Sequence, residues 1–151
     1  MPVNTNHPPV HFHFLKGGNS LSNRSDLKSF IASLFKKEKK RLEDIHYVFC
    51  SDDYLLEINR QHLQHDYYTD IITFDLSEKG SEIISGEIYI SVDRVRNNAK
   101  TAGYLISVEL LRVIFHGVLH LCGYGDKKRG ERAIMREKED YYIHKYLNRS
   151  T

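Results

Sequence analysis

Apolar and polar residues alternate in several short stretches of this chain. Residues 10–14 and 86–92 alternate with a period of two, which is typical of strands with one buried face. Residues 45–50 form a nearly continuous apolar run with aromatic and β-branched side chains, and residues 70–76 have similar strand character. The pattern therefore predicts four short strands, at 10–14, 45–50, 70–76 and 86–92.

Apolar residues three and four positions apart predict five helices. We expect Ser25 to cap the first and Asp93 to cap the third. The fourth is apolar nearly all round, which indicates a buried central helix, and Gly123 follows directly after its end. The first helix ends in the basic run at 36–41. The predicted helices span about 25–41, 51–63, 93–102, 107–122 and 128–147.

The order of these elements favours an α+β fold, since the strands do not alternate regularly with helices. The chain has 151 residues, of which 40% are hydrophobic, so it is long enough to bury a core. We find no internal repeat and no linker-like segment. Residues 1–151 are therefore expected to form a single domain.

Charge and composition exclude few functions. The net charge is +2, which by itself is too small to indicate nucleic-acid binding, so an RNA partner would need a local basic patch. Cys50 and Cys122 each lie in an apolar run, as expected for buried free thiols in a reducing compartment. No signal peptide and no apolar run of 18 residues is present, so we expect a cytoplasmic protein without a membrane partner.

The stretch HGVLHLCGYGD, residues 116–126, carries the chemistry. His116 and His120 are one helical turn apart, which places both imidazoles on one face, about 6 Å apart along the axis. Because Gly123 ends the helix, Asp126 can return toward the same point. Two imidazoles and one carboxylate, with a position left for water, are typical of catalytic metal sites. We expect His116, His120 and Asp126 to bind one divalent cation.

The same residues also fit a site without metal. The two histidines could be core residues bonded to backbone carbonyls, and Asp126 could cap the last helix. The metal is favoured because burying two histidines without a partner is costly. Gly117 inside the helix also costs about 1 kcal/mol relative to alanine, which suggests that something approaches the backbone closely.

The same stretch resembles the H-G-x-L-H-L-x-G-Y-D-H signature of the YbeY family of bacterial rRNA maturation factors. The segment 57–74 is similar to a second block of that family, and GEIYIS at 86–91 is similar to its GDIVIS strand. Three blocks in the same order make the resemblance specific, and it covers most of the chain. Further matching positions are Asn59, Thr69, Asp70, Phe74 and Met135.

The resemblance implies a function. Members of the family are described as single-strand-specific, metal-dependent endoribonucleases that act in maturing the 3′ end of small-subunit rRNA and in ribosome quality control. Their α+β fold packs the histidine helix beneath a small mixed sheet, here of about four strands with about five helices. By resemblance, His116 and His120 are metal ligands, the metal is Zn²⁺, and metal-activated water attacks the phosphodiester. The implied partners are rRNA and the small ribosomal subunit, not DNA.

Two positions depart from the family pattern. Asp126 stands where the third ligand is usually histidine, and a set of two histidines and one aspartate also suits Fe²⁺ or Mn²⁺, so the metal is less certain. Leu63 stands where an arginine is usual, and leucine cannot bind a phosphate. The candidate substrate-binding cations are therefore Arg60, one turn earlier, with Lys127 and Lys128 after the third ligand.

Three function classes follow. The first is the endoribonuclease, and the second is a non-catalytic ribosome-assembly factor with a structural metal, which the changes at Leu63 and Asp126 leave open. A zinc peptidase is disfavoured because its general-base glutamate would stand at Gly117. Asp70 is expected either to hydrogen-bond a ligand imidazole or to cap a turn. His11 and His13 lack a third ligand nearby in sequence and are interpreted as partly exposed strand residues.

Overall fold

The computed structural model describes residues 7–18 and 21–149, and these form an α+β fold with four strands and five helices. Element order follows the prediction from the pattern of apolar residues. The strands are β1 (Val10–Phe14), β2 (Arg41–Cys50), β3 (Ile71–Asp75) and β4 (Ile83–Ser91). The helices are α1 (Arg24–Lys37), α2 (Asp52–Leu63), α3 (Val92–Ala102), α4 (Ile106–Leu121) and α5 (Arg129–Leu147).

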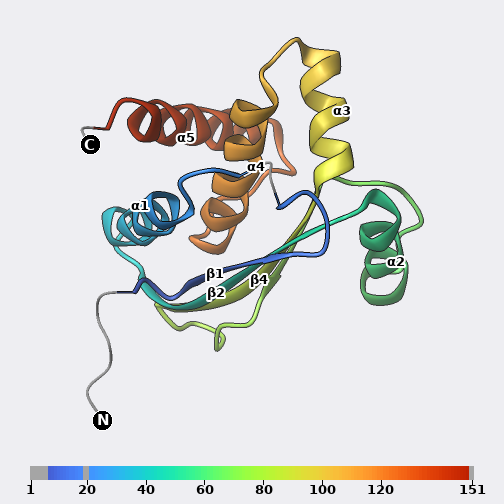
Figure 1. Ribbon diagram of the computed structural model, residues 1–151. Coiled ribbons are helices and arrows are strands. Elements are labelled where there is room, and N and C mark those ends of the chain that lie inside the picture. Colours follow the sequence, from blue (N-terminus) through green and yellow to red (C-terminus); the bar gives the residue numbers. More distant parts are fainter. Residues whose placement is uncertain (1–6, 19–20, 150–151) are drawn as a thin grey trace.

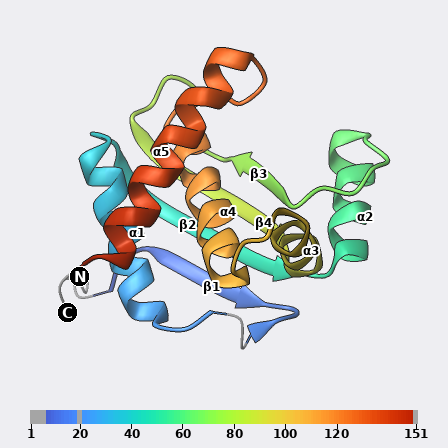
Figure 2. The ribbon, with the colours of Figure 1, turned by 90° about the horizontal axis from the view of Figure 1, so that it is seen from above.

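The four strands form one mixed sheet in the order β1-β2-β4-β3. β1, β2 and β4 run parallel, and β3 pairs antiparallel with β4. Figure 1 shows α1, α4 and α5 on one side of the sheet, while α2 lies at one end. In Figure 2, α4 crosses the middle of the sheet and α5 lies beside it. The mixed sheet of four strands with five helices is as expected.

The main core lies between the sheet and α4. Ile45, Tyr47 and Phe49 of β2 alternate into it and are almost completely buried. The Tyr47 hydroxyl donates a hydrogen bond of 2.8 Å to the carbonyl of Ile114, which ties β2 to α4. Because nine of the sixteen residues of α4 are buried, the nearly continuous apolar pattern of this segment correctly indicated a central helix.

A smaller apolar cluster lies on the opposite face of the sheet, where α2 covers β3 and β4. Its buried members are Cys50, Leu55 and Ile72. Cys122 belongs to the main core instead. Both cysteines are free and buried, as their apolar surroundings in the sequence predicted.

The start of α1 and the start of β2 differ from the prediction. Asn23, not Ser25, occupies the position before α1, with a positive φ of 53° and no side-chain cap. α1 ends at Lys37, and the chain is already in β2 at Arg41. β2 begins four residues before the predicted strand because its first half pairs with β4 from Ile83 onward. This long-range pairing overrides the polar sequence at 41–44.

The cap of α3 was also predicted wrongly. Ser91 caps the helix, since its hydroxyl accepts a hydrogen bond of 3.1 Å from the backbone N–H of Arg94. The carboxylate of Asp93 instead accepts from the N–H of Asp52 at 2.9 Å and pairs with Lys16 at 2.7 Å. It therefore fastens the start of α2 to the start of α3.

The glycines expected at two helix ends are confirmed. Gly103 follows α3 with a φ of 75°, and Gly123 follows α4 with a φ of 110°. Both angles favour glycine over any residue with a side chain. Within residues 7–18 and 21–149, no helix is long and apolar enough to cross a membrane.

Candidate metal and catalytic site

The three predicted ligands line one cavity beside the edge strand of the sheet. His116 and His120 lie on α4, and Asp126 lies in the turn between α4 and α5. The cavity has a volume of about 410 Å³, and β3 contributes its wall at Ile71, Ile72 and Thr73. The fold therefore brings side chains from α4 and from the following turn to the same hollow.

His116 contacts two carboxylates. Its Nε2 lies 3.1 Å from Oδ2 of Asp126, and its Nδ1 lies 2.7 Å from Oε2 of Glu139. Burial disfavours the imidazolium, but the hydrogen bond and charge of Glu139, with the charges of Asp126 and Asp70, outweigh it and raise the pKa of His116. The ring is thus held in an acidic environment that also suits a cation.

His120 is held differently. Its Nδ1 lies 3.1 Å from the carbonyl oxygen of Tyr124, an acceptor, so this nitrogen carries the proton. Donation from Nδ1 leaves Nε2 with its lone pair, which is the usual arrangement of a histidine that binds metal. His116 is prepared in the same way, because Glu139 accepts from its Nδ1 and its Nε2 faces Asp126.

The imidazole and carboxylate donors of the three residues are suitable metal ligands, but the three donor atoms do not all lie close together. Those of His116, His120 and Asp126 do not lie within 4.8 Å of one another; among the described residues, only a group on the sheet meets that spacing. His116 and Asp126 are already in contact, so His120 is the separate member. The His120 side chain is exposed, and its ring would have to move toward the pair to complete the set.

Glu139 is a candidate functional residue that no motif in the sequence singled out, and it contacts His116 directly. It is 5% exposed, and Arg112 balances its charge through an ion pair of 3.1 Å. Arg112 also pairs with the exposed Asp140 at 2.8 Å. Glu139 lies on the stripe of α5 that contains the buried Met135 and Tyr142, so an acidic residue in an otherwise apolar stripe was the available signal.

Asp70 does not hydrogen-bond an imidazole in the described structure. Asp70 lines an adjoining cavity of about 350 Å³, together with Arg136, Glu139 and His116. Burial raises the pKa of Asp70, although the nearby His116 opposes this effect. Its backbone carbonyl accepts from the N–H of Ser91 at 2.9 Å. Asp70 therefore acts on the site through charge, not through a direct bond.

The candidate substrate-binding cations separate into two groups. Lys127 lines the 410 Å³ cavity. Arg136, which no motif in the sequence indicated, lines the adjoining cavity. Arg60 instead pairs with Asp66 at 2.5 Å and lines neither cavity, while Lys128 only precedes α5. Leu63 contributes an apolar side chain to the larger cavity.

Two open questions about this segment are answered by the geometry. Lys128 occupies the position before α5, so Asp126 is not the cap of that helix. Gly117 faces the sheet: a Cβ atom there would lie 2.9 Å from Cδ1 of Ile88 and 3.1 Å from Cδ1 of Ile71. The close approach expected at Gly117 is therefore helix–sheet packing, and this glycine is not evidence for a ligand.

Comparison with known proteins agrees with this architecture. The model of the family "Endoribonuclease YbeY" matches residues 19–147. The chain is 50% identical to the endoribonuclease YbeY of Cytophaga hutchinsonii over 121 residues, which cover 80% of this chain and 83% of the relative. It is 57% identical to that of Phocaeicola vulgatus over 101 residues, 67% of this chain and 72% of the relative.

A solved structure is similar as well. The solution structure of TM1509 from Thermotoga maritima superposes with a TM-score of 0.67 at 31% identity, covering 91% of this chain and 89% of the other. The family model spans β2, β3, β4 and all five helices, and β1 lies before the matched residues. The chain belongs to the YbeY endoribonuclease family.

Proposed function

We propose that this chain hydrolyses phosphodiester bonds of single-stranded rRNA, using one divalent cation held by His116, His120 and Asp126. The observation that carries the proposal is the arrangement around His116: Nδ1 is fixed by the buried Glu139, and Nε2 faces Asp126 across 3.1 Å. Membership of an endoribonuclease family supports RNA as the substrate. The cellular role that we propose is maturation of the 3′ end of small-subunit rRNA and ribosome quality control in the cytoplasm. The small ribosomal subunit is the proposed partner.

A divalent metal, which we expect to be Zn²⁺, would supply a Lewis acid and an activated water near neutral pH. The protein's own groups have other tasks. Glu139 holds the His116 ring in one orientation. Lys127 in the larger cavity and Arg136 in the adjoining one place positive charge beside the ligands, where the attacked phosphate gains negative charge.

The larger cavity also suits an unpaired base. Tyr67 lines it, and its ring stacks on His65 with centroids 5.1 Å apart. Because 56% of Tyr67 remains exposed, a base can stack on this aromatic pair. Leu63 adds an apolar wall at the position where the family usually has arginine. Since stacking needs a base outside a duplex, these side chains favour single strands over double helices.

The test compares RNA cleavage by the zinc-loaded protein and by its ligand variants. His116→Ala and Asp126→Ala should each lower the cleavage rate of a single-stranded rRNA fragment by about 100-fold or more, the range seen when one charge-stabilising group is removed. His62→Ala removes a histidine outside this ligand set and should leave the rate unchanged. A duplex of the same sequence should resist cleavage, and a chelator should abolish it.

Cleavage that persists in both ligand variants would show that the activity belongs to a contaminant. If the protein co-sediments with small ribosomal subunits but cleaves no RNA, the site is structural and the chain is an assembly factor without catalysis. Either result would overturn the proposal.

A further inference from the structure

A second group of histidines lies on the face of the sheet opposite α4. The register of the parallel strands β1 and β2 places His11 directly beside His46. Residues two apart on a strand share a face, so Asp44 lies on the same face as His46, and His13 on the same face as His11. The core-facing neighbours, such as Ile45 and Tyr47, are buried, whereas this group is partly open to solvent.

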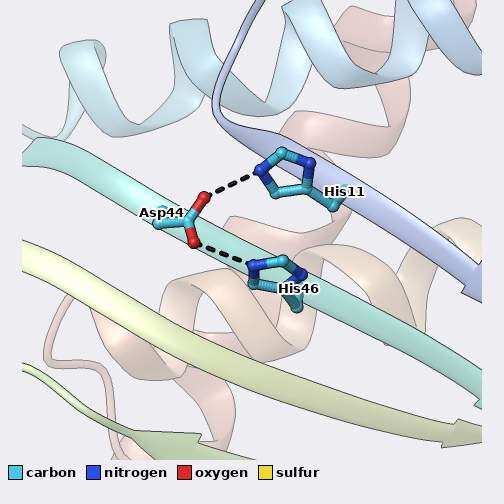
Figure 3. A group of neighbouring side chains, drawn as sticks. All are labelled: His11, Asp44 and His46. Carbon is cyan, nitrogen blue, oxygen red and sulfur yellow. Dashed lines mark hydrogen bonds and ion pairs between the residues drawn. The ribbon is translucent and has the colours of Figure 1, made fainter.

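The imidazoles of His11 and His46 both point toward the carboxylate of Asp44 (Figure 3). Nε2 of His11 lies 2.8 Å from Oδ1 of Asp44, and Nε2 of His46 lies 2.8 Å from Oδ2 of the same carboxylate. The two rings stack with centroids 4.4 Å apart. The carboxylate therefore lies beside the stacked pair and bridges the Nε2 edges of two imidazoles that are carried by neighbouring strands.

We propose that His11, Asp44 and His46 form a second metal site, which binds one first-row transition cation such as Zn²⁺. Their donor atoms all lie within 4.8 Å of one another. A tetrahedral ion bonded at about 2.0–2.2 Å needs donors about 3.3 Å apart, so small rotations of the side chains complete the set. Two imidazoles and a carboxylate are borderline ligands, which favour Zn²⁺, Ni²⁺ or Cu²⁺ over Ca²⁺ or Mg²⁺.

A fourth residue prepares His46 for this role. Nε2 of His13 lies 2.8 Å from Nδ1 of His46, so one of these two nitrogens donates to the other. With a cation on Nε2 of His46, the proton of that ring moves to Nδ1 and is donated to His13. His13 is thus a positioning residue, which fixes the tautomer and the orientation of a ligand ring as partners of metal-bound histidines commonly do.

The backbone holds these residues in place before any ion binds. His11 and His46 are paired residues of a regular parallel ladder, and Asp44 follows the single irregularity in the pairing of β2 with β4. The site is also accessible, because the three side chains are 38–45% exposed. The remaining coordination positions therefore face solvent, where water or a group from another molecule can enter.

The experiment measures how many zinc ions bind per chain and where. Zn²⁺ is titrated into the metal-free wild type and into His46→Ala by calorimetry, and ring ¹⁵N–¹H NMR spectra locate the ions. His46→Ala should bind one equivalent fewer than the wild type. In the wild type, the ring nitrogens of His11 and His46 should shift with that equivalent. His13→Phe should retain the equivalent with about 10- to 100-fold weaker affinity.

His62→Ala is the matched control and should bind as many ions as the wild type. Circular dichroism checks that every variant is folded. If His46→Ala and Asp44→Asn both bind as many ions as the wild type, or if the His11 and His46 rings do not respond to Zn²⁺, the group is only a hydrogen-bonded cluster. Because the difference between variants is measured, this result does not depend on whether the α4 site binds metal or cleaves RNA.

Discussion

Glu139 is the residue on which the candidate active site most depends. A nearly buried carboxylate is costly unless its charge is compensated, and here Arg112 and His116 compensate it together. The candidate ligand His116 is therefore part of a charge network that extends from α4 to α5. Removing the charge of Glu139 should disturb the metal site without removing any ligand.

Glu139→Gln tests this expectation. The substitution preserves the shape of the side chain but weakens the acceptor of the His116 Nδ1 proton, so zinc affinity at the α4 site should fall about 10- to 100-fold. The affinity is measured by calorimetry in the His46→Ala background, which removes a ligand of the proposed sheet site. Asp140→Asn is the control, since Asp140 binds the same Arg112 from an exposed position and should leave zinc affinity unchanged. Equal affinities for both variants would contradict the assigned role.

Sequence could predict part of this site and not the rest. That His116, His120 and Asp126 line one cavity could be predicted, because one helical turn and one helix end determine where they lie. Glu139 is 23 residues from its partner, and no local spacing connects α5 to α4. The same reason hid the group on the sheet, because Asp44 is 33 residues from His11 and meets it only through strand pairing.

At the scale of elements, the spacing between α4 and the sheet determines where the ligands lie. Gly117 permits this spacing, because its missing side chain leaves room for Ile88 and Ile71. A Cβ at this position would push α4 away from Ile88 of β4 and Ile71 of β3, and β3 forms a wall of the cavity. The cost of overpacking, typically about 1–3 kcal/mol, exceeds the gain of roughly 1 kcal/mol from alanine in a helix.

Gly117→Ala should therefore lower the free energy of unfolding by about 1 kcal/mol, measured by urea denaturation. Gly130→Ala provides the contrast: Gly130 is in α5, and nothing lies within 4 Å of an added Cβ. This control should unfold at the same urea concentration as the wild type or a higher one. If Gly117→Ala is stabilised to the same extent, the packing argument is wrong.

Sequence patterns predicted the type and order of all nine elements but not all their ends. Local periodicity is a property of each segment, so α4 was recognised from its own residues. The beginning of β2 was missed because residues 41–44 are mostly polar and are held by pairing with β4. The parallel pairing of β1, β2 and β4 is likewise decided by contacts between distant segments.

At the scale of the whole molecule, one carboxylate connects the end of the first helix, α1, with the last helix, α5. Glu38 follows α1 and accepts hydrogen bonds from the hydroxyls of Tyr124, at 2.6 Å, and Tyr142. Lys138 of α5 also pairs with it at 3.3 Å. Burial disfavours the carboxylate, but the hydrogen bonds from Tyr124, Tyr142 and Lys138 outweigh it and hold the pKa of Glu38 below its ordinary 4.5.

A pKa that is lower in the folded state means that the ionised form of Glu38 stabilises the fold. This contribution is complete above pH 4.5 and is lost as the pH falls through the lower pKa of the folded state. Glu38→Gln should therefore cost about 1–3 kcal/mol at pH 7, and the difference from wild type should shrink in acid. The free energies of unfolding of both proteins are measured by urea denaturation at pH 7 and in acid. Glu137→Gln, at an exposed position, should show neither effect, and a difference that does not change with pH would contradict the assignment.

The two buried cysteines make local opening of the folded protein measurable. Burial raises the pKa of both the Cys50 and the Cys122 thiol to about 12, so neither reacts with an alkylating reagent until its surroundings open. Cys50 lies beneath α2 and Cys122 lies at the end of α4, on opposite sides of the sheet. The alkylation rates of the two thiols therefore report separately on local opening at the α2 side and at the α4 side of the sheet.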